Sequence, residues 1–231
     1  MSALRRRALV WGLACLAAAG CIYVDRAEDV LGLADVRVGD VLFQQIDNRT
    51  GRLICAVTDS RLNHCGIVVP GPQGELCVLE AVGPVTRTPL KTFVARGRGT
   101  GLLVTRFREP YRGQVRQIVQ ACLDYQGAPY DTRFEPSADR LYCTELIAQG
   151  FEDVTGDPLG ARVRIGILNW RPYEREVREY FGGAIPLDRE VLTPADLAAA
   201  PQIERVWSNM FGQAPRVEKR WRVGVGVGGS L

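Results

Sequence analysis

The chain has 231 residues, of which 46% are hydrophobic and 24% are charged, as in ordinary globular proteins, and this length fits one well-packed domain. The formal charge of +3 falls to zero when residues 1–20, which contain Arg5, Arg6 and Arg7, are set aside. A neutral chain has no electrostatic attraction for nucleic acid, and we predict no nucleic-acid partner.

The first 20 residues have the layout of an export signal. A basic stretch precedes an apolar run from Ala8 to Ala19, which is shorter than the roughly 20 residues that a membrane-spanning helix needs. The letters AAGC, which end at Cys21, resemble the end of a bacterial lipoprotein signal. The resemblance implies that Cys21 is lipidated and anchors an exported protein on the periplasmic side of the outer membrane. Plain secretion with an unmodified Cys21 is the alternative.

Strands are predicted first along the chain. Residues 35–46 alternate apolar and polar side chains around a Gly-Asp turn, and residues 47–63 follow as a loop, a short apolar piece and a polar stretch. The apolar runs over residues 64–69 and 75–82 flank the turn letters PGPQG, which predicts a β-hairpin. Residues 101–107 predict a further strand.

Helices follow the strands. Residues 113–131 and 143–156 both place apolar side chains at helical spacing and both contain a terminating glycine. Residues 167–183 predict a strand edge and a short helix, and a further helix is expected after Thr193 as N-cap, with Pro194 at its first position. Strands followed by helices favour an α+β domain over repeating βαβ units.

Five cysteines remain when Cys15 and Cys21 are set aside. An odd number in an exported protein indicates at least one free thiol. The sequence contains neither a Cys-x-x-Cys pair nor zinc-ligand spacing, so we predict no metal site. Four of the five could pair as disulfides or lie in the core, and the sequence leaves this open: Cys55, Cys65, Cys77 and Cys122.

The fifth cysteine, Cys143, begins a predicted helix and is a candidate nucleophile. The helix dipole and the free N–H groups of a first turn favour a thiolate there, and a neighbouring histidine lowers the pKa of a thiol further. The only histidine is His64. With the hairpin centred on Pro72, His64 lies directly opposite Glu80, whose carboxylate would orient the imidazole. The alternatives are a packed histidine, a buried thiol and an exposed carboxylate at a sheet edge.

The letters VGDVLFQ, LNHCGIVV, VLEAVGPV and YCTELI, in this order, resemble the circularly permuted branch of the NlpC-type, papain-like cysteine hydrolases, the YiiX/YaeF-like family. The resemblance covers about residues 36–200. It implies a papain-like α+β fold in which an antiparallel, barrel-like sheet packs on the nucleophile helix. It also implies that Cys143 is the nucleophile, His64 the base and Glu80 the third catalytic residue.

The function implied by the resemblance is that of a cysteine amidase or peptidase. It would cleave a small amide or a cell-wall peptide through an acyl-enzyme on Cys143, with no cofactor. One alternative is a thiol acyltransferase or lipase that acts on lipids, as in relatives similar to lecithin:retinol acyltransferase. Another is a non-catalytic ligand-binding lipoprotein of the same fold. A long apolar groove would favour lipid, and a narrow pocket with a carboxylate or amine anchor would favour a peptide end.

Two tyrosines that precede the nucleophile, Tyr130 and Tyr142, are candidate substrate-binding residues. Tyr130 lies in the letters GAPYD, which resemble the segment before the nucleophile in that family. We expect Trp170, Tyr173 and Trp207 to be packing residues instead of a wall of the substrate site.

Four segments are expected along the chain. Residues 1–20 are the signal peptide and residues 21–35 a linker that carries the lipid anchor. Residues 36–212 form the permuted papain-like hydrolase domain. Residues 213–231, which are rich in Gly and Val, form a flexible tail.

Overall fold

A computed structural model of the chain describes residues 27–32, 34–135 and 139–210. The predicted signal peptide, the predicted lipidation site Cys21 and the predicted tail lie outside the described residues. Of the predicted linker, residues 27–32 are helical, and Ala27 and Val30 are buried there. Among the described residues, the structure has no helix that is both long and apolar enough to cross a membrane.

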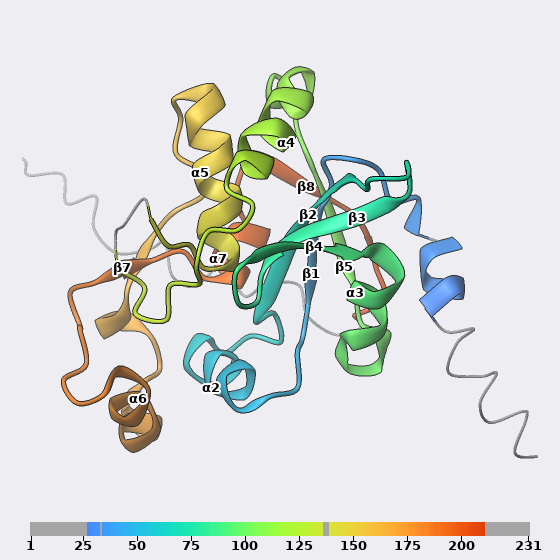
Figure 1. Ribbon diagram of the computed structural model, residues 1–231. Helices are drawn as coiled ribbons and strands as arrows, with labels where there is room; N and C mark the ends of the chain where they lie inside the picture. Colours follow the sequence, from blue (N-terminus) through green and yellow to red (C-terminus); the bar gives the residue numbers. More distant parts are fainter. Residues whose placement is uncertain (1–26, 33, 136–138, 211–231) are drawn as a thin grey trace, which may run out of the picture.

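A six-stranded sheet with the strand order β4-β3-β2-β1-β5-β8 lies at the centre of the fold (Figure 1). Each pair of neighbouring strands is antiparallel. The strands are β1 (Val41–Gln44), β2 (His64–Pro70), β3 (Leu76–Ala81), β4 (Val85–Pro89), β5 (Leu103–Phe107) and β8 (Ile203–Ser208). A separate two-stranded sheet joins β6 (Val163–Arg164) to β7 (Glu190–Val191).

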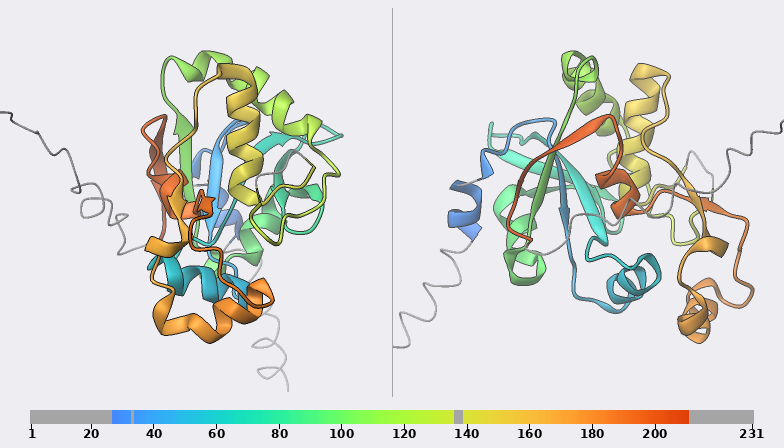
Figure 2. Two further views of the ribbon diagram at one scale, coloured as in Figure 1. Left: turned by 90° about the vertical axis from the view of Figure 1, so that its left-hand side faces the viewer. Right: turned by 180° about the vertical axis from the view of Figure 1, so that it is seen from behind.

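Helices cover the two faces of the large sheet. The pair α4 and α5 packs on one face, and α3 lies on the other (Figures 1 and 2). The α-helices are α2 (Arg49–Thr58), α3 (Leu90–Arg96), α4 (Val115–Asp124), α5 (Cys143–Thr155), α6 (Glu174–Phe181) and α7 (Pro194–Ala198). Short 3-10 turns are η1 (Arg98–Thr100), η2 (Tyr111–Gln114), η3 (Ile165–Ile167) and η4 (Arg171–Tyr173).

Alternate side chains of β2 point into the cores on the two faces of the sheet. Cys65 and Ile67 belong to the core beneath α4 and α5, and Val68 belongs to the core beneath α3. His64, the first residue of β2, lies on the α3 side, where its ring centroid is 5.9 Å from that of Phe93. The beginning of this interior strand therefore carries a histidine and a cysteine on opposite faces of the sheet.

The predicted hairpin of β2 and β3 is present, but its register differs by two residues from the expected one. Val68 pairs with Val78, so His64 does not lie directly opposite Glu80, and that prediction is wrong. A two-residue shift leaves each side chain on the face that was expected for it, because strands have period two. His64 and Glu80 consequently remain on one face, as diagonal neighbours.

The turn of this hairpin explains the shift. The N–H of Gly71 donates to the carbonyl of Glu75 over 2.7 Å, which centres the hairpin on Gln73 instead of Pro72. Gly74 closes the turn with a φ of 88°, a left-handed conformation that glycine adopts without steric cost. The three-residue loop with a left-handed glycine is a common hairpin connection, and the expected register placed it one residue too early, at residues 71–73 instead of 72–74.

Several elements were not predicted. The segment over residues 47–63 contains α2, a full helix whose N-cap, Asn48, accepts a hydrogen bond from the N–H of Gly51 over 2.7 Å. The strands β4 and β8 and the helix α3 were also missed.

The helix after Thr193 is confirmed, and the Thr193 hydroxyl accepts from the N–H of Asp196 as an N-cap does. The described cysteines are all free thiols.

Candidate active site

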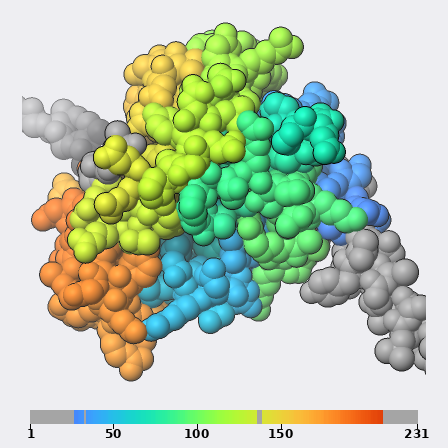
Figure 3. Space-filling view, viewed as in Figure 1, coloured from blue at the N-terminus to red at the C-terminus, as the bar shows by residue number. Residues whose placement is uncertain are grey.

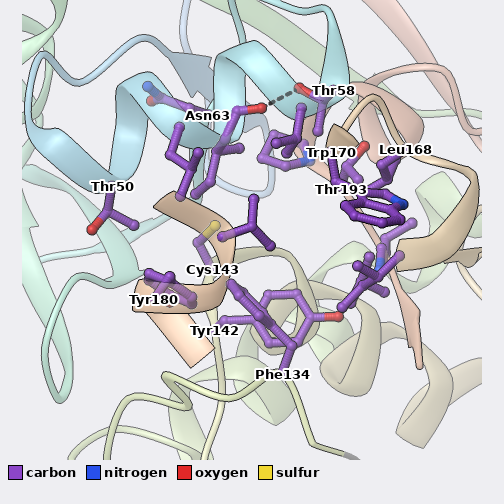
Figure 4. A pocket seen from close by; sticks show the side chains of 18 of the residues that line it. Thr50, Thr58, Asn63, Phe134, Tyr142, Cys143, Leu168, Trp170, Tyr180 and Thr193 are labelled. Atoms are coloured by element: carbon purple, nitrogen blue, oxygen red, sulfur yellow. Dashed lines mark hydrogen bonds between the residues drawn. The ribbon is translucent and has the colours of Figure 1, made fainter. Parts of the chain in front are cut away.

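Cys143 is the first residue of α5, and its side chain is buried. The preceding residue, Tyr142, has extended backbone angles and makes no side-chain cap, so the first turn of α5 begins abruptly at the thiol. Backbone N–H groups of such a first turn have no partner within the helix, and they favour negative charge at this position. Figure 4 shows the Cys143 sulfur among the side chains that line a pocket.

His64 and Glu80 are in contact. Nε2 of His64 lies 2.5 Å from Oε2 of Glu80, and the Glu80 side chain is completely buried. An ionised carboxylate only accepts hydrogen bonds, so Nε2 carries the proton and Nδ1 is the ring nitrogen that remains for the thiol. Burial by itself lowers the pKa of His64, but hydrogen bonds with Cys143 and Glu80 outweigh it and raise the pKa to about 9.

The thiol of Cys143 is strongly perturbed. A hydrogen bond from the Cys65 thiol, together with a hydrogen bond and the positive charge of His64, holds the pKa of Cys143 well below its ordinary value despite burial. Burial and the neighbouring sulfur of Cys143 raise the pKa of Cys65 well above its ordinary value. The pKa shifts of the two cysteines are therefore opposite: that of Cys143 favours the thiolate, and that of Cys65 favours the neutral thiol.

Two further side chains hold Glu80, and neither was predicted from the sequence. Nη2 of Arg96 donates to Oε2 of Glu80 over 2.5 Å, and Oγ1 of Thr88 donates to Oε1 over 2.5 Å. Burial alone raises the pKa of Glu80, but hydrogen bonds from His64, Arg96 and Thr88 bring that pKa below its usual value. The guanidinium of Arg96 also lies over the ring of Phe93, 5.5 Å from its centroid. Glu80 is thus a fixed, ionised partner for the imidazole.

The pocket beside Cys143 has an empty volume of about 770 Å³, counted to its open mouth. Its wall combines one side of α2, the helix α6, the chain around η3 and η4, and residues 191–194. Figure 3 shows the segments of α2 and α6 next to each other on one face of the molecule. Trp170, expected as a packing residue, lines this pocket, whereas Trp207 packs against the core beneath α3.

Both tyrosines named from the sequence line the pocket. The Tyr142 hydroxyl accepts a hydrogen bond from the N–H of Leu192 over 3.1 Å, so it is held by the backbone. Burial and the charge of Cys143 raise the pKa of Tyr130 well above its usual value. Tyr180 of α6, which the sequence did not single out, has its pKa raised to about 12 by burial, Asp131 and Cys143. Neutral hydroxyls of Tyr130 and Tyr180 therefore lie near the thiolate.

An antiparallel sheet that presents a histidine and a carboxylate to a cysteine at the start of a packed helix defines the class of papain-like cysteine hydrolases. A comparison with protein families makes the assignment specific. The permuted papain-like amidase family, C92, which includes YaeF and YiiX, matches residues 35–207, and the chain belongs to this family. The predicted papain-like α+β fold is therefore confirmed, and the protein belongs at family level to the cysteine amidases.

Individual relatives agree with the family. The chain is 30% identical over 173 residues to YiiX of Escherichia coli (strain K12), which is described as uncharacterized, and the match covers 74% of this chain and 85% of YiiX. A crystal structure of YiiX from Escherichia coli O157:H7 superposes with a TM-score of 0.69 at 30% identity, and the match covers 74% of this chain and 97% of that one.

The crystallised YiiX is described as a metalloprotein. In the described part of the present chain, His, Cys, Asp and Glu side chains do not gather in groups of three or more that could hold a metal ion. Around the thiol, the nearby imidazole and carboxylate are already engaged with each other, because Nε2 of His64 is bonded to Glu80. These residues do not fit a metal site, and the chemistry proposed below uses side chains alone.

Proposed function

We propose that the protein is a cysteine amidase in which Cys143 is the nucleophile, His64 the acid and base, and Glu80 the residue that orients the imidazole. The observation that supports this most is the contact of one histidine with both a buried carboxylate and the thiol that begins α5. A nucleophile, a base and an orienting group joined by hydrogen bonds are the parts that acyl transfer requires.

The reaction follows from these positions. The Cys143 thiolate attacks the carbonyl carbon of the amide, an S–C bond forms, and the carbonyl oxygen becomes an oxyanion that the N–H groups at the start of α5 stabilise. The C–N bond then breaks as the His64 imidazolium donates its Nδ1 proton to the departing amine. Water attacks the thioester, His64 accepts a proton from it, and the carboxylic acid leaves while the thiolate is restored.

The hydrogen bonds that Arg96 and Thr88 donate to Glu80 keep the imidazole oriented during the reaction. Arg96 and Thr88 each occupy a carboxylate oxygen, so Glu80 stays ionised while His64 gains and loses a proton. An imidazole whose Nε2–H is fixed in this way keeps Nδ1 towards the sulfur. A neutral residue in place of Glu80 would leave the ring less oriented and less basic.

The pH dependence of Cys143 alkylation tests the proposal. The mature chain, prepared without lipid, is treated with iodoacetamide from pH 5 to 9, and labelled peptides are identified by mass spectrometry. Preferential labelling of Cys143 below pH 7, lost in His64→Ala and weakened in Glu80→Gln, is the expected result. The neutral thiols serve as internal controls, because burial raises the pKa of Cys55 and Cys122. Labelling of Cys143 only above about pH 8, unchanged in His64→Ala, would contradict the proposal.

Turnover separates the amidase from a ligand-binding protein of the same fold. A catalytic protein releases amine from a simple amide, and Cys143→Ala abolishes the release. A binding protein would bind the same amide without releasing amine.

We also propose that the domain is exported and anchored through lipid on Cys21. The support is the sequence before Cys21, a basic stretch followed by a short apolar run. Labelling of cells with a radioactive fatty acid tests this: the wild type should incorporate label and partition with outer membranes, and Cys21→Ser should do neither.

A further inference from the structure

The pocket beside Cys143 is apolar. Side chains of α2 supply one wall through Leu53, Ile54 and Val57, and α6 supplies another through Val177 and Phe181. In the part of the chain that the structure describes, the lining contains no Asp, Glu, Lys, Arg or His. Cys143, whose lowered pKa favours the thiolate, is thus the lining residue that carries charge in an otherwise uncharged pocket. A substrate that enters deeply must leave its charged groups outside, because an unpaired charge in an apolar site is costly.

Several polar side chains of the wall are already bonded to the protein. Oδ1 and Nδ2 of Asn63 bond to the backbone of Ile46 over 2.8 and 2.9 Å. Nε1 of Trp170 donates to a backbone carbonyl over 3.2 Å, and Oγ1 of Thr58 does the same over 2.7 Å. These groups are not available to hold the ammonium or carboxylate of a peptide end. Thr50, Tyr130 and Tyr180 add only uncharged hydroxyls, so the described wall offers a peptide terminus no charged anchor.

The position of His64 decides which part of the substrate occupies the pocket. The departing amine must reach His64 to receive its proton, and His64 does not line the pocket, whereas Cys143 does. The acyl group, which stays on the sulfur after the amine leaves, is consequently the part that faces the apolar walls.

Resting on the amidase function proposed above, we infer that the substrate is an N-acyl amide whose acyl group is an apolar chain. This chain binds between α2 and α6 and remains there in the acyl-enzyme. Tyr130 and Tyr180, whose pKa values the charge of Cys143 raises, line this pocket as well.

A series of acyl p-nitroanilides tests the inference. Acetyl, butyryl, hexanoyl and octanoyl compounds are compared with succinyl and 4-aminobutyryl compounds, which end in a carboxylate and an ammonium. Each methylene that becomes fully buried should raise kcat/KM by about fourfold, until the pocket is full. Both charged compounds should react more slowly than butyryl. Rates that are independent of chain length, or fastest with a charged compound, would overturn the inference while leaving the amidase function intact.

Binding to an inactive variant separates the two proposals. Calorimetry with Cys143→Ala measures the affinity for butanamide, hexanamide and octanamide without any chemical step. Affinity that rises with chain length supports the apolar site even if the wild type turns over no amide, in which case the proposed function fails alone. Equal affinity for the three amides would refute the apolar site.

A pair of variants on α2 locates the acyl chain. Val57→Lys places an ammonium in the pocket wall. Ala56→Lys adds the same charge at the preceding residue, which does not line the pocket. The ratio of octanoyl to acetyl rates should fall at least tenfold in Val57→Lys and stay unchanged in Ala56→Lys. Thermal melting checks that both variants are folded. Equal ratios in the two folded variants would show that the acyl chain lies elsewhere.

Discussion

The charge of Glu80 should control the protonation of His64. The pKa of His64 is raised from 6.5 to about 9. At about 1.4 kcal/mol per pKa unit, this shift corresponds to roughly 3 kcal/mol in favour of the imidazolium. Part of that energy comes from the Glu80 carboxylate, 2.5 Å away. Glu80→Gln keeps an acceptor of similar shape but removes the charge, so we expect the pKa of His64 to fall by about 1–3 units.

The single histidine of the sequence makes this measurement direct. Protein with labelled histidine, purified through a tag that contains no histidine, gives one imidazole Cε1–Hε1 signal in an NMR titration from pH 5 to 10.5. The signal of the wild type should titrate near pH 9, and Cys143→Ala should also lower the pKa, because it removes the thiolate. Glu75→Gln is a matched control, since Glu75 is an exposed carboxylate of the same hairpin.

Two results would refute this account of the electrostatics. A wild-type pKa near 6.5 would mean that burial cancels the two hydrogen bonds. An unchanged pKa in Glu80→Gln would mean that the thiolate alone holds the proton on the imidazole. In the second case Glu80 would have only a structural role.

Three further predictions concern stability and the thiolate. Arg96→Met leaves the buried Glu80 carboxylate with one fewer charged partner and should lower the free energy of unfolding by about 2–3 kcal/mol in urea titrations. A loss below about 0.5 kcal/mol would show that the Arg96–Glu80 ion pair contributes little to stability. Burial is the main cause that raises the pKa of Glu145 from 4.5 to about 7. Because Glu145 ionises more easily in the unfolded chain, the free energy of unfolding should fall as pH rises between these two values. Glu145→Gln should therefore add about 2 kcal/mol at pH 8 and almost nothing at pH 4, and an equal gain at both would count against burial as the cause. Cys65→Ala removes a hydrogen bond to the thiolate, so the pH midpoint of Cys143 alkylation should rise; an unchanged midpoint would assign the low pKa to histidine alone.

Much of the fold and the site follows from periodicity. The apolar spacing after Cys143 predicts α5, and the alternation in β2 and β3 predicts the hairpin and the shared face of His64 and Glu80. These are local patterns, because the side chains that define them are close in sequence. The order of four short sequence motifs added the expected roles of the three residues, through resemblance to a family and not through geometry.

The parts that the sequence did not reveal depend on contacts between distant segments. Arg96 lies on α3, a short helix that has only seven residues and that follows an edge strand directly. Its side chain reaches Glu80 because the sheet and α3 pack together, which no local pattern indicates. Tyr180 likewise reaches the pocket through the placement of α6. The helix α2 was missed because its turns contain Ile, Val and Thr, residues that favour strands in the absence of other information.

Gly66, two residues after His64, helps to explain how His64 and Glu80 meet although they are not directly opposite each other. In the observed register, extended by one step, Gly66 lies opposite Glu80. A Cβ atom on Gly66 would stand 2.4 Å from Cγ1 of Val78, 2.9 Å from the carbonyl oxygen of Leu79 and 3.2 Å from Cβ of Glu80. Because glycine has no side chain, Val78 and Glu80 can both approach this strand closely, and the Glu80 side chain can lie diagonally across the strand pair towards the imidazole. The glycine two residues after the histidine is thus part of the site, although it carries no chemistry of its own.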